Sequence, residues 1–171
     1  MPFIEGTGLG TPLIHSGTPS AGTNEVQTGT IGGTPTGGTF RLGLNGIFTG
    51  PITWVNNNTN LITNIQNALN STFGSNQIVA AVGTMTGGVG TFTLTFSGTE
   101  YQRLDVPAME VINNLTGTSP TLSIAITTPG VTATHRGCAK GALLIDVQNA
   151  VLYINTGTPT APTWTVVGTQ S

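Results

Sequence analysis

The residues best suited to covalent chemistry lie around the single cysteine, Cys138. Its close neighbours in the chain include His135, Arg136 and Lys140. A nearby positive charge lowers the pKa of a thiol and makes it a better nucleophile. Covalent catalysis also needs a base at a recognisable spacing, and the sequence offers none, because a contact with His15 would require the chain to fold back. We therefore interpret Cys138 as a small loop residue.

Acidic and metal-ligating residues indicate no clearer site. Asp105 and Glu110 are a candidate carboxylate pair for glycoside chemistry. The chain holds only six acidic residues, so isolated structural roles are the favoured interpretation. His15 and His135 lie far apart in the sequence and show no metal-ligand spacing. A glycine-rich nucleotide-binding loop leads directly into a helix, but the glycine-rich stretches of this chain precede none. We predict that the protein is not an enzyme and holds neither a cofactor nor a metal.

The composition indicates a protein whose surface is covered by neighbours. Charged residues make up 6% of the chain, against about a quarter in typical soluble domains. Hydrophobic residues reach 37%, which is enough for a core. Hydroxyl and amide groups pack against a partner without the cost of burying a charge. This pattern favours a subunit of an assembly, and a β-rich secreted domain is the alternative.

Charge and hydropathy also exclude some partners. The net charge is −2, and the four basic residues are scattered along the chain. Nucleic-acid binding needs a clustered basic surface, so none is expected. No apolar run approaches membrane-spanning length, and the start of the chain does not resemble a signal peptide. We expect synthesis in the cytoplasm and no membrane partner.

One helix is predicted, over residues 58–74. An apolar residue recurs every four positions on one face, at Leu61, Ile65 and Leu69. Asn58 or Thr59 is the expected N-cap, and Gly74 is expected to end the helix in a left-handed conformation.

The remaining elements are predicted to be strands. Asn45-Gly46 is a strong hairpin signal. Residues 101–114 are harder to assign, and either a short helical turn or a loop with one strand fits their pattern. The fold class is mainly β (α+β): a small antiparallel sheet with one helix packed across it. Core strands are expected at residues 39–44, 47–55, 77–83, 91–97 and 121–127.

Three regions are expected along the chain. Residues 1–37 form an extended N-terminal arm, 38–130 a β-rich core domain with the helix, and 131–171 a C-terminal β-meander. The arm is rich in glycine and proline and has sparse apolar residues that would seat in pockets of another protein. These candidate contacts are Phe3, Ile4, Leu9, Leu13 and Ile14.

The C-terminal meander is expected to have strands at 141–147, 151–155 and 163–168. Three short strands are marginally stable alone, so they need the core domain, other copies or another protein. Tyr153, Trp164 and Val166 are the candidate contacts between copies, although packing in the core would use the same residues.

The tail of the chain resembles a C-terminal segment of tailed-bacteriophage virion proteins. The core resembles a phage virion module, so the resemblance covers about residues 39–171 and leaves the arm unmatched. The chain departs from the pattern at Cys138 and Ala150, where a small residue or glycine is expected. The matching tail segments are Gly141–Asp146, Leu152–Thr158 and Thr163–Thr169; the matching core segments are Phe40–Leu42, Ile65–Leu69, Phe92–Gly98 and Leu115–Gly117.

This resemblance implies a capsid decoration (cement) protein. Such a protein would sit on the outer surface of the virion, bind the major capsid protein and form a homotrimer. A receptor-binding, fibre or tail structural subunit is the alternative that the same resemblance leaves open. No sequence pattern indicates which phage or host is involved.

Overall fold

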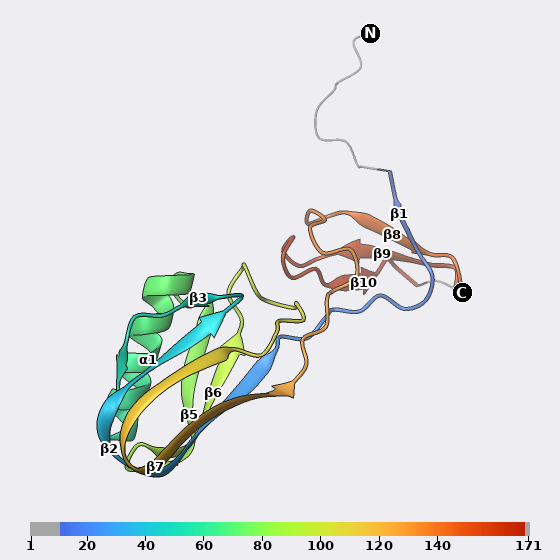
Figure 1. The fold of residues 1–171 in the computed structure, drawn as a ribbon. Helices are drawn as coiled ribbons and strands as arrows, with labels where there is room; N and C mark the ends of the chain where they lie inside the picture. The colour runs from blue at the N-terminus through green and yellow to red at the C-terminus, as the bar shows by residue number, and fades with distance from the viewer. Residues whose placement is uncertain (1–10, 170–171) are drawn as a thin grey trace. The chain divides into compact units, whose positions relative to one another are not determined.

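The computed structural model of the protein describes residues 11–169 (Figure 1). The chain divides into two compact units, one of residues 23–131 and one that combines the segments before 23 and after 131. The described residues are mainly β-strand with one helix, which confirms the predicted fold class. The expected boundary of the arm at residue 37 is wrong, because it falls inside β2 (Val26–Leu44).

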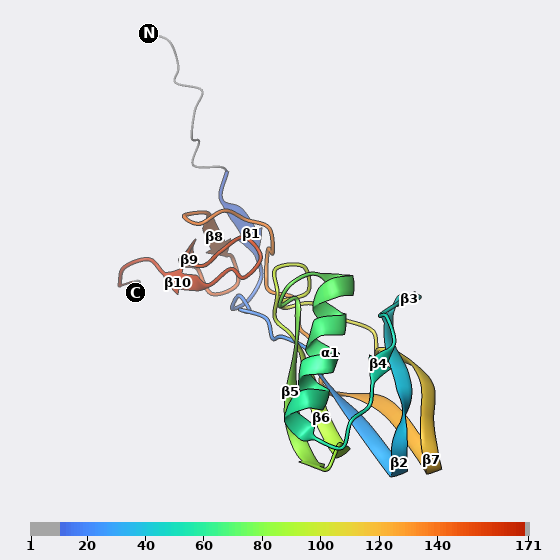
Figure 2. The same ribbon diagram turned by 90° about the vertical axis from the view of Figure 1, so that its left-hand side faces the viewer.

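The larger unit is built on the pairing of two long strands, β2 and β7 (Glu110–Thr128), each of 19 residues. They run antiparallel from Val26 opposite Thr128 to Gly43 opposite Glu110. Figures 1 and 2 show the resulting ribbon bent back on itself. For residues 101–114 the sequence pattern fitted either a helical turn or a loop with one strand. The residues from Glu110 onward belong to β7, so the second interpretation is the correct one.

Glycines permit the close approach of the two strands at the bend. Gly33 and Gly38 have φ of 75° and 93°, and a Cβ there would lie 2.1 and 2.4 Å from the carbonyl oxygens of Ser119 and Asn114. Only glycine fits such positions without strain. The register shifts between Gly32 and Thr34 and again after Pro35, so the ribbon turns at this point.

Four further strands complete the larger sheet. β3 (Ile47–Phe48) and β4 (Ile52–Thr53) pair with the second half of β2. β6 (Val89–Phe96) pairs with the first half of β2, and β5 (Ile78–Thr86) pairs with β6. The predicted Asn45-Gly46 hairpin is confirmed, since both residues have positive φ (51° and 77°) and join β2 to β3.

The core lies between the two halves of the bent sheet and the helix. Alternate residues of β2 and β6 supply its centre, as the period of two requires. The ring of Phe92 lies over Gly29 on the neighbouring strand, where a Cβ would stand 2.1 Å from the ring. The largest fully buried side chains of this unit are Phe40, Phe92, Phe96, Ile31, Leu42, Ile52, Leu61, Ile65, Leu69, Ile78 and Leu94.

The helix α1 (Asn58–Phe73) covers the edge of β5 through a side-chain amide. Nε2 of Gln66 donates to the carbonyl of Ile78 (3.0 Å), and its Oε1 accepts from the N–H of Ala80 (2.8 Å). These are the two bonds that a further strand would make with β5. Nε2 of Gln66 also donates to Oδ1 of Asn70 at 2.8 Å, which fixes the orientation of the amide.

Two more amides of α1 bind the sheet in the same way. Asn58 donates to the carbonyl of Met85 and accepts from the N–H of Gly88, both at 2.8 Å. Asn64 donates to the carbonyl of Thr53 in β4 at 3.0 Å. The helix therefore joins the edges of β4 and β5 through the amides of Asn58, Asn64 and Gln66.

The predicted helix is confirmed, with a difference at its first turn. Asn57 is the N-cap, and its Oδ1 accepts from the N–H of Asn60 at 2.9 Å. The expected cap at Asn58 or Thr59 is therefore wrong, since the side chain of Asn58 binds the sheet instead. Gly74 ends the helix with φ of 95° and ψ of 155°, outside the left-handed helical region that was expected.

The smaller unit is a four-stranded sheet in the order β1-β8-β9-β10. The C-terminal meander is present as β8 (Leu143–Asp146), β9 (Val151–Asn155) and β10 (Trp164–Val166). β1 (Leu13–His15) adds to it parallel to β8. Leu13 and Ile14 therefore belong to a sheet and not to an unpaired arm. Ala150, where the resemblance predicts a small residue or glycine, has φ of 55°.

We predict that Gln66→Ala lowers the free energy of unfolding of the larger unit by about 1–3 kcal/mol, because the N–H and C=O groups of β5 lose their partners. Asn67→Ala is the matched control, since Asn67 is exposed on the same helix, and a change within about 0.5 kcal/mol is expected. Urea unfolding followed by the fluorescence of Trp54, with Trp164 replaced by Phe, measures the free energy of unfolding of both variants. Equal effects of the two substitutions would contradict the role of the Gln66 amide.

Candidate functional site

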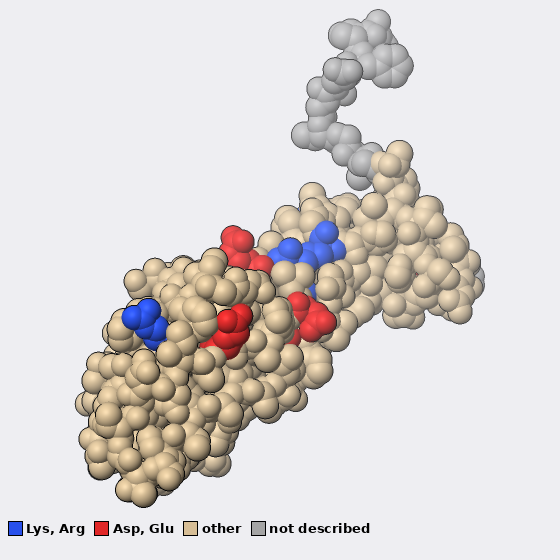
Figure 3. Space-filling model, in the orientation of Figure 1, with Lys and Arg blue, Asp and Glu red and all other residues tan. Residues whose placement is uncertain are grey.

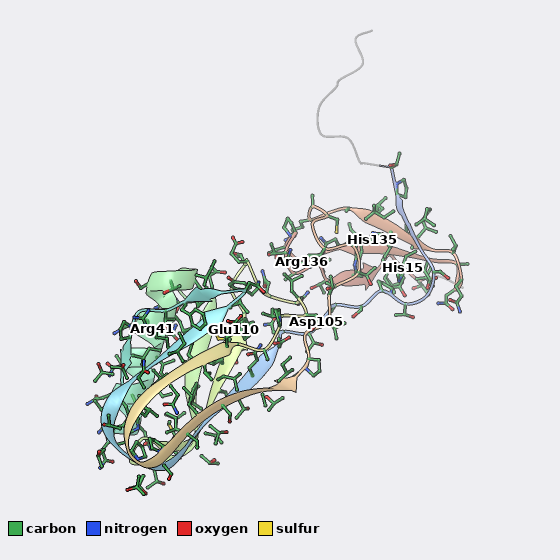
Figure 4. The ribbon with its side chains drawn as sticks, in the orientation of Figure 1. His15, Arg41, Asp105, Glu110, His135 and Arg136 are labelled. Atoms are coloured by element: carbon green, nitrogen blue, oxygen red, sulfur yellow. The ribbon has the colours of Figure 1, made fainter. Side chains whose placement is uncertain are left out.

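The smaller unit brings His15 and His135 together, although they are distant in the sequence. Their ring centroids are 5.7 Å apart in an edge-on arrangement, and His135 packs edge-on against Trp164 at 6.4 Å. Figure 4 shows both histidines in this unit. The fold-back of His15 that the sequence did not require therefore occurs, and it rests on the pairing of β1 with β8.

Cys138 lies near this cluster in the chain but has the properties of a structural thiol. Burial raises its pKa above the ordinary value, outweighing the hydrogen bonds from its own backbone and from Asn155, which lower it. A raised pKa keeps the thiol protonated and weakly nucleophilic. Nδ2 of Asn155 donates to the carbonyls of Cys138 and Ala139, both at 3.1 Å. The loop is thus held on the sheet by an amide, in agreement with the structural interpretation.

The two acidic residues singled out in the sequence are both exposed. Glu110 accepts a hydrogen bond from the N–H of Gly46 at 3.3 Å, so it supports the β2–β3 turn. Figure 4 shows Asp105 on the loop before β7 and Glu110 at the start of that strand. In residues 11–169, no three His, Cys, Asp or Glu side chains are placed to hold a metal ion.

A fully buried carboxylate, Glu25, was not singled out by the sequence patterns. Its Oε2 accepts from the N–H of Val106 at 2.8 Å, and its Oε1 contacts Nε2 of Gln27. Oε1 of Gln27 accepts from the N–H of Met109 at 2.8 Å. These bonds attach the loop before β7 to β2, so both side chains have a structural use. The same face of the chain continues with Gln27 and Gly29, so the sequence showed no apolar alternation that would mark Glu25 as buried.

A groove of about 280 Å³ lies between α1 and the segment that contains β4. No charged residue, histidine or cysteine lines it, so its walls supply no group for acid–base or nucleophilic chemistry. Its lining residues are Gly50, Pro51, Ile52, Thr53, Asn64, Asn67, Ala68 and Ser71.

A further candidate surface is one face of the smaller sheet, which we call the aliphatic face. The strand register places Ile14 beside Ile145, and Ile145 beside Leu152. A backbone bond from Val167 to the carbonyl of Leu152 (2.9 Å) extends the row. Ile14 is 60% exposed and Val167 37%. The aliphatic face consists of Ile14, Leu143, Ile145, Leu152, Ile154 and Val167.

The opposite face of this sheet carries the residues that were predicted to contact other copies. Tyr153 is buried beside Leu144, and the indole N–H of Trp164 donates to the carbonyl of Thr134 at 3.0 Å. These two aromatics therefore serve packing within the unit, as the alternative interpretation held. Val166 is 45% exposed and remains accessible. Of the candidate arm contacts, Phe3, Ile4 and Leu9 lie outside the described residues.

Charge is sparse on the surface as well as in the sequence. Figure 3 shows few acidic and basic side chains on a face that is otherwise uncharged. A partner of this face would therefore meet mainly apolar and neutral hydrogen-bonding groups. No helix within residues 11–169 has both the length and the apolar character that crossing a bilayer demands.

We predict that the stability of the smaller unit falls when Asp146 is protonated. Burial raises the pKa of this carboxylate, but hydrogen bonds from Asn149, Gly17 and Gln148 outweigh it and hold the pKa below the ordinary value of 3.8. A carboxylate with a lowered folded-state pKa stabilises the fold above its unfolded pKa, and this contribution is lost as the pH falls through the folded value.

Urea unfolding followed by the fluorescence of Trp164, with Trp54 replaced by Phe, is expected to give constant stability above about pH 5 and a decline below pH 4. Asp146→Asn is expected to be less stable at pH 7 and to lose most of the acid-dependent decline. An unchanged decline in that variant would show that another group causes it.

Comparison with known proteins returned no match: no protein-family model and no curated protein sequence matches the chain.

Proposed function

We propose that the protein decorates the outer surface of a bacteriophage capsid and cements neighbouring major capsid subunits. The observation that supports this most is the aliphatic face, which is uncharged, carries exposed Ile14 and Val167, and belongs to a sheet of short strands. A sheet of this kind gains stability when a second layer covers its apolar face. The aliphatic face is therefore the proposed attachment surface for the major capsid protein.

The chemistry of the surface suits permanent attachment. Burying a large aliphatic side chain contributes about 1.5–3 kcal/mol relative to leaving it in water. An uncharged surface adds no penalty for stripping water from ions. Many copies that each bridge two subunits add their binding free energies to the closed shell, so a modest interface per copy is sufficient.

The larger unit would act as a rigid body in this role. The helix fixes both edges of the bent sheet through Gln66, Asn58 and Asn64, so the unit needs no partner to complete its core. Attachment is therefore assigned to the smaller unit, where an apolar face is accessible. A homotrimer is the copy number that the phage resemblance implies; the two-fold contact proposed below is the alternative to it, and the mass of the purified chain in solution decides between them.

We predict that Ile14→Glu and Val167→Glu each weaken binding to empty expanded shells of the encoding phage by at least about tenfold, which corresponds to about 1.4 kcal/mol. A carboxylate in an apolar interface loses its hydration without gaining a partner. Co-sedimentation of purified protein with purified shells measures the bound fraction.

Val82→Glu is the matched control, because Val82 is a 46% exposed aliphatic residue on β5 of the larger unit. It is expected to bind as the unchanged chain does. Trp164 fluorescence verifies that the smaller unit of each variant is folded. Failure of the unchanged chain to sediment with shells at any stage of capsid maturation would overturn the proposed function.

A further inference from the structure

The outer edge of β7 makes no strand pairing among residues 11–169, where β7 pairs only with β2. The N–H of Phe96 donates to the carbonyl of Glu25 at 3.0 Å, so Glu25 and every second residue after it direct their backbone groups toward β6. Thr28 and Thr30 then direct theirs toward β7, because these directions alternate along a strand.

The same alternation fixes the directions on β7 itself. Thr28 and Thr30 face Ala125 and Ser123, whose backbone groups therefore bond to β2. The residues of β7 on either side of Ser123 and Ala125 point their N–H and C=O groups away from β2. These outward-pointing residues are Leu122, Ile124 and Ile126.

The other strand edges within residues 11–169 are covered or short, and the edge strands of the smaller sheet, β1 and β10, have three residues each. The edge of β5 is bonded by Gln66, and β3 and β4 contain two residues each. Near the bend, Asn113 accepts from the N–H of Leu115 and donates to the carbonyl of Pro120. The stretch of β7 after Pro120 has no comparable cover.

Between Pro120 and the register shift at Thr127, residues Leu122–Ile126 form a regular stretch of strand that carries no charged side chain. Native edges are commonly protected by lysine, proline, a bulge or short length. From Val111 to Thr128 the strand has no charged residue, and its proline lies at the bend. Ile126 is 40% exposed in addition. An edge without charge does not repel a second copy of itself.

We propose that residues Leu122–Ile126 of β7 pair antiparallel with the same residues of a second copy, around a two-fold axis at Ile124. Such a contact is self-complementary, because each copy presents the same donors and acceptors. The pairing provides about six backbone hydrogen bonds. It also places Leu122 of one copy opposite Ile126 of the other, which covers the exposed aliphatic side chain.

The first test is the mass of the full chain in solution, measured by sedimentation velocity over a range of concentrations. The pairing predicts a species of twice 17.4 kDa. Ile126→Pro removes one outward N–H, and Ile126→Lys places a charged side chain against Leu122 of the other copy, so both are expected to shift the protein to the monomer. Val82→Lys, which adds the same charge at an exposed aliphatic position of β5, is expected to leave the dimer intact.

The second test uses amide hydrogen exchange, resolved by residue. The N–H groups of Ser123 and Ala125 bond to β2 and are expected to be protected at every concentration. Those of Leu122 and Ile124 are expected to be protected only when the dimer forms, and to exchange rapidly in Ile126→Lys. Dimerisation through another surface would not make the protection of Leu122 and Ile124 depend on concentration.

A monomer at all concentrations, a trimer, or a dimer that survives Ile126→Lys would each overturn the proposed pairing. The readouts use purified protein without shells, so they are independent of the capsid proposal. If Ile126→Pro fails to fold, as judged by Trp54 fluorescence, Ile126→Lys and the exchange pattern still decide the question.

Discussion

The need of strand edges for hydrogen-bond partners shapes most of the larger unit, with the outer edge of β7 as the exception. β2 satisfies it on both sides, with β6 and β7 on its first half and with β4, β3 and β7 on its second. Because the ribbon bends, the two ends of the sheet come to face the same helix. Gln66 and Asn64 then supply to β5 and β4 the bonds that a further strand would have made. The helix is thus both a cover for the core and a substitute for a strand.

This arrangement explains the unusual polar composition of the helix. A solvated helix face normally carries lysine and glutamate, whereas this one carries Asn, Gln and Thr. A side-chain amide offers one acceptor and two donors in nearly the geometry of a peptide group, so it can replace one at a strand edge. A charged side chain could supply only one of these functions. The absence of charge at Asn58, Asn64 and Gln66 follows from these contacts, whereas Asn60 and Asn67 are exposed to solvent and are uncharged without such a contact.

Much of the fold was predictable because it follows local rules. The stripe of Leu61, Ile65 and Leu69 predicted the helix, and Asn45-Gly46 predicted its hairpin. The path of β2 was not predictable, because glycine and proline between Gly32 and Gly38 are typical of a loop. Only the pairing with β7, some 80 residues away, makes them strand residues. The parallel pairing of β1 with β8 is a long-range contact of the same kind, and three residues are too few to show it by periodicity.

The candidate surfaces depended on the same long-range pairings. Tyr153 and Trp164 were predicted as contacts between copies, but the strand register places them on the face that the loop after residue 132 covers. Ile14 was predicted as an arm contact, and pairing with β8 makes it part of a continuous apolar face. No sequence motif marks the outer edge of β7, because whether a strand edge is unpaired depends on which other strands lie beside it.

The helix also lacks acidic residues in its first turn and basic residues in its last. It therefore gains nothing from the interaction of charges with the helix dipole, which salt screens. Its attachment through neutral amides and aliphatic side chains has no titrating group between pH 5 and 9. The attachment of the helix to the sheet is consequently insensitive to ionic strength and to changes of pH within this range.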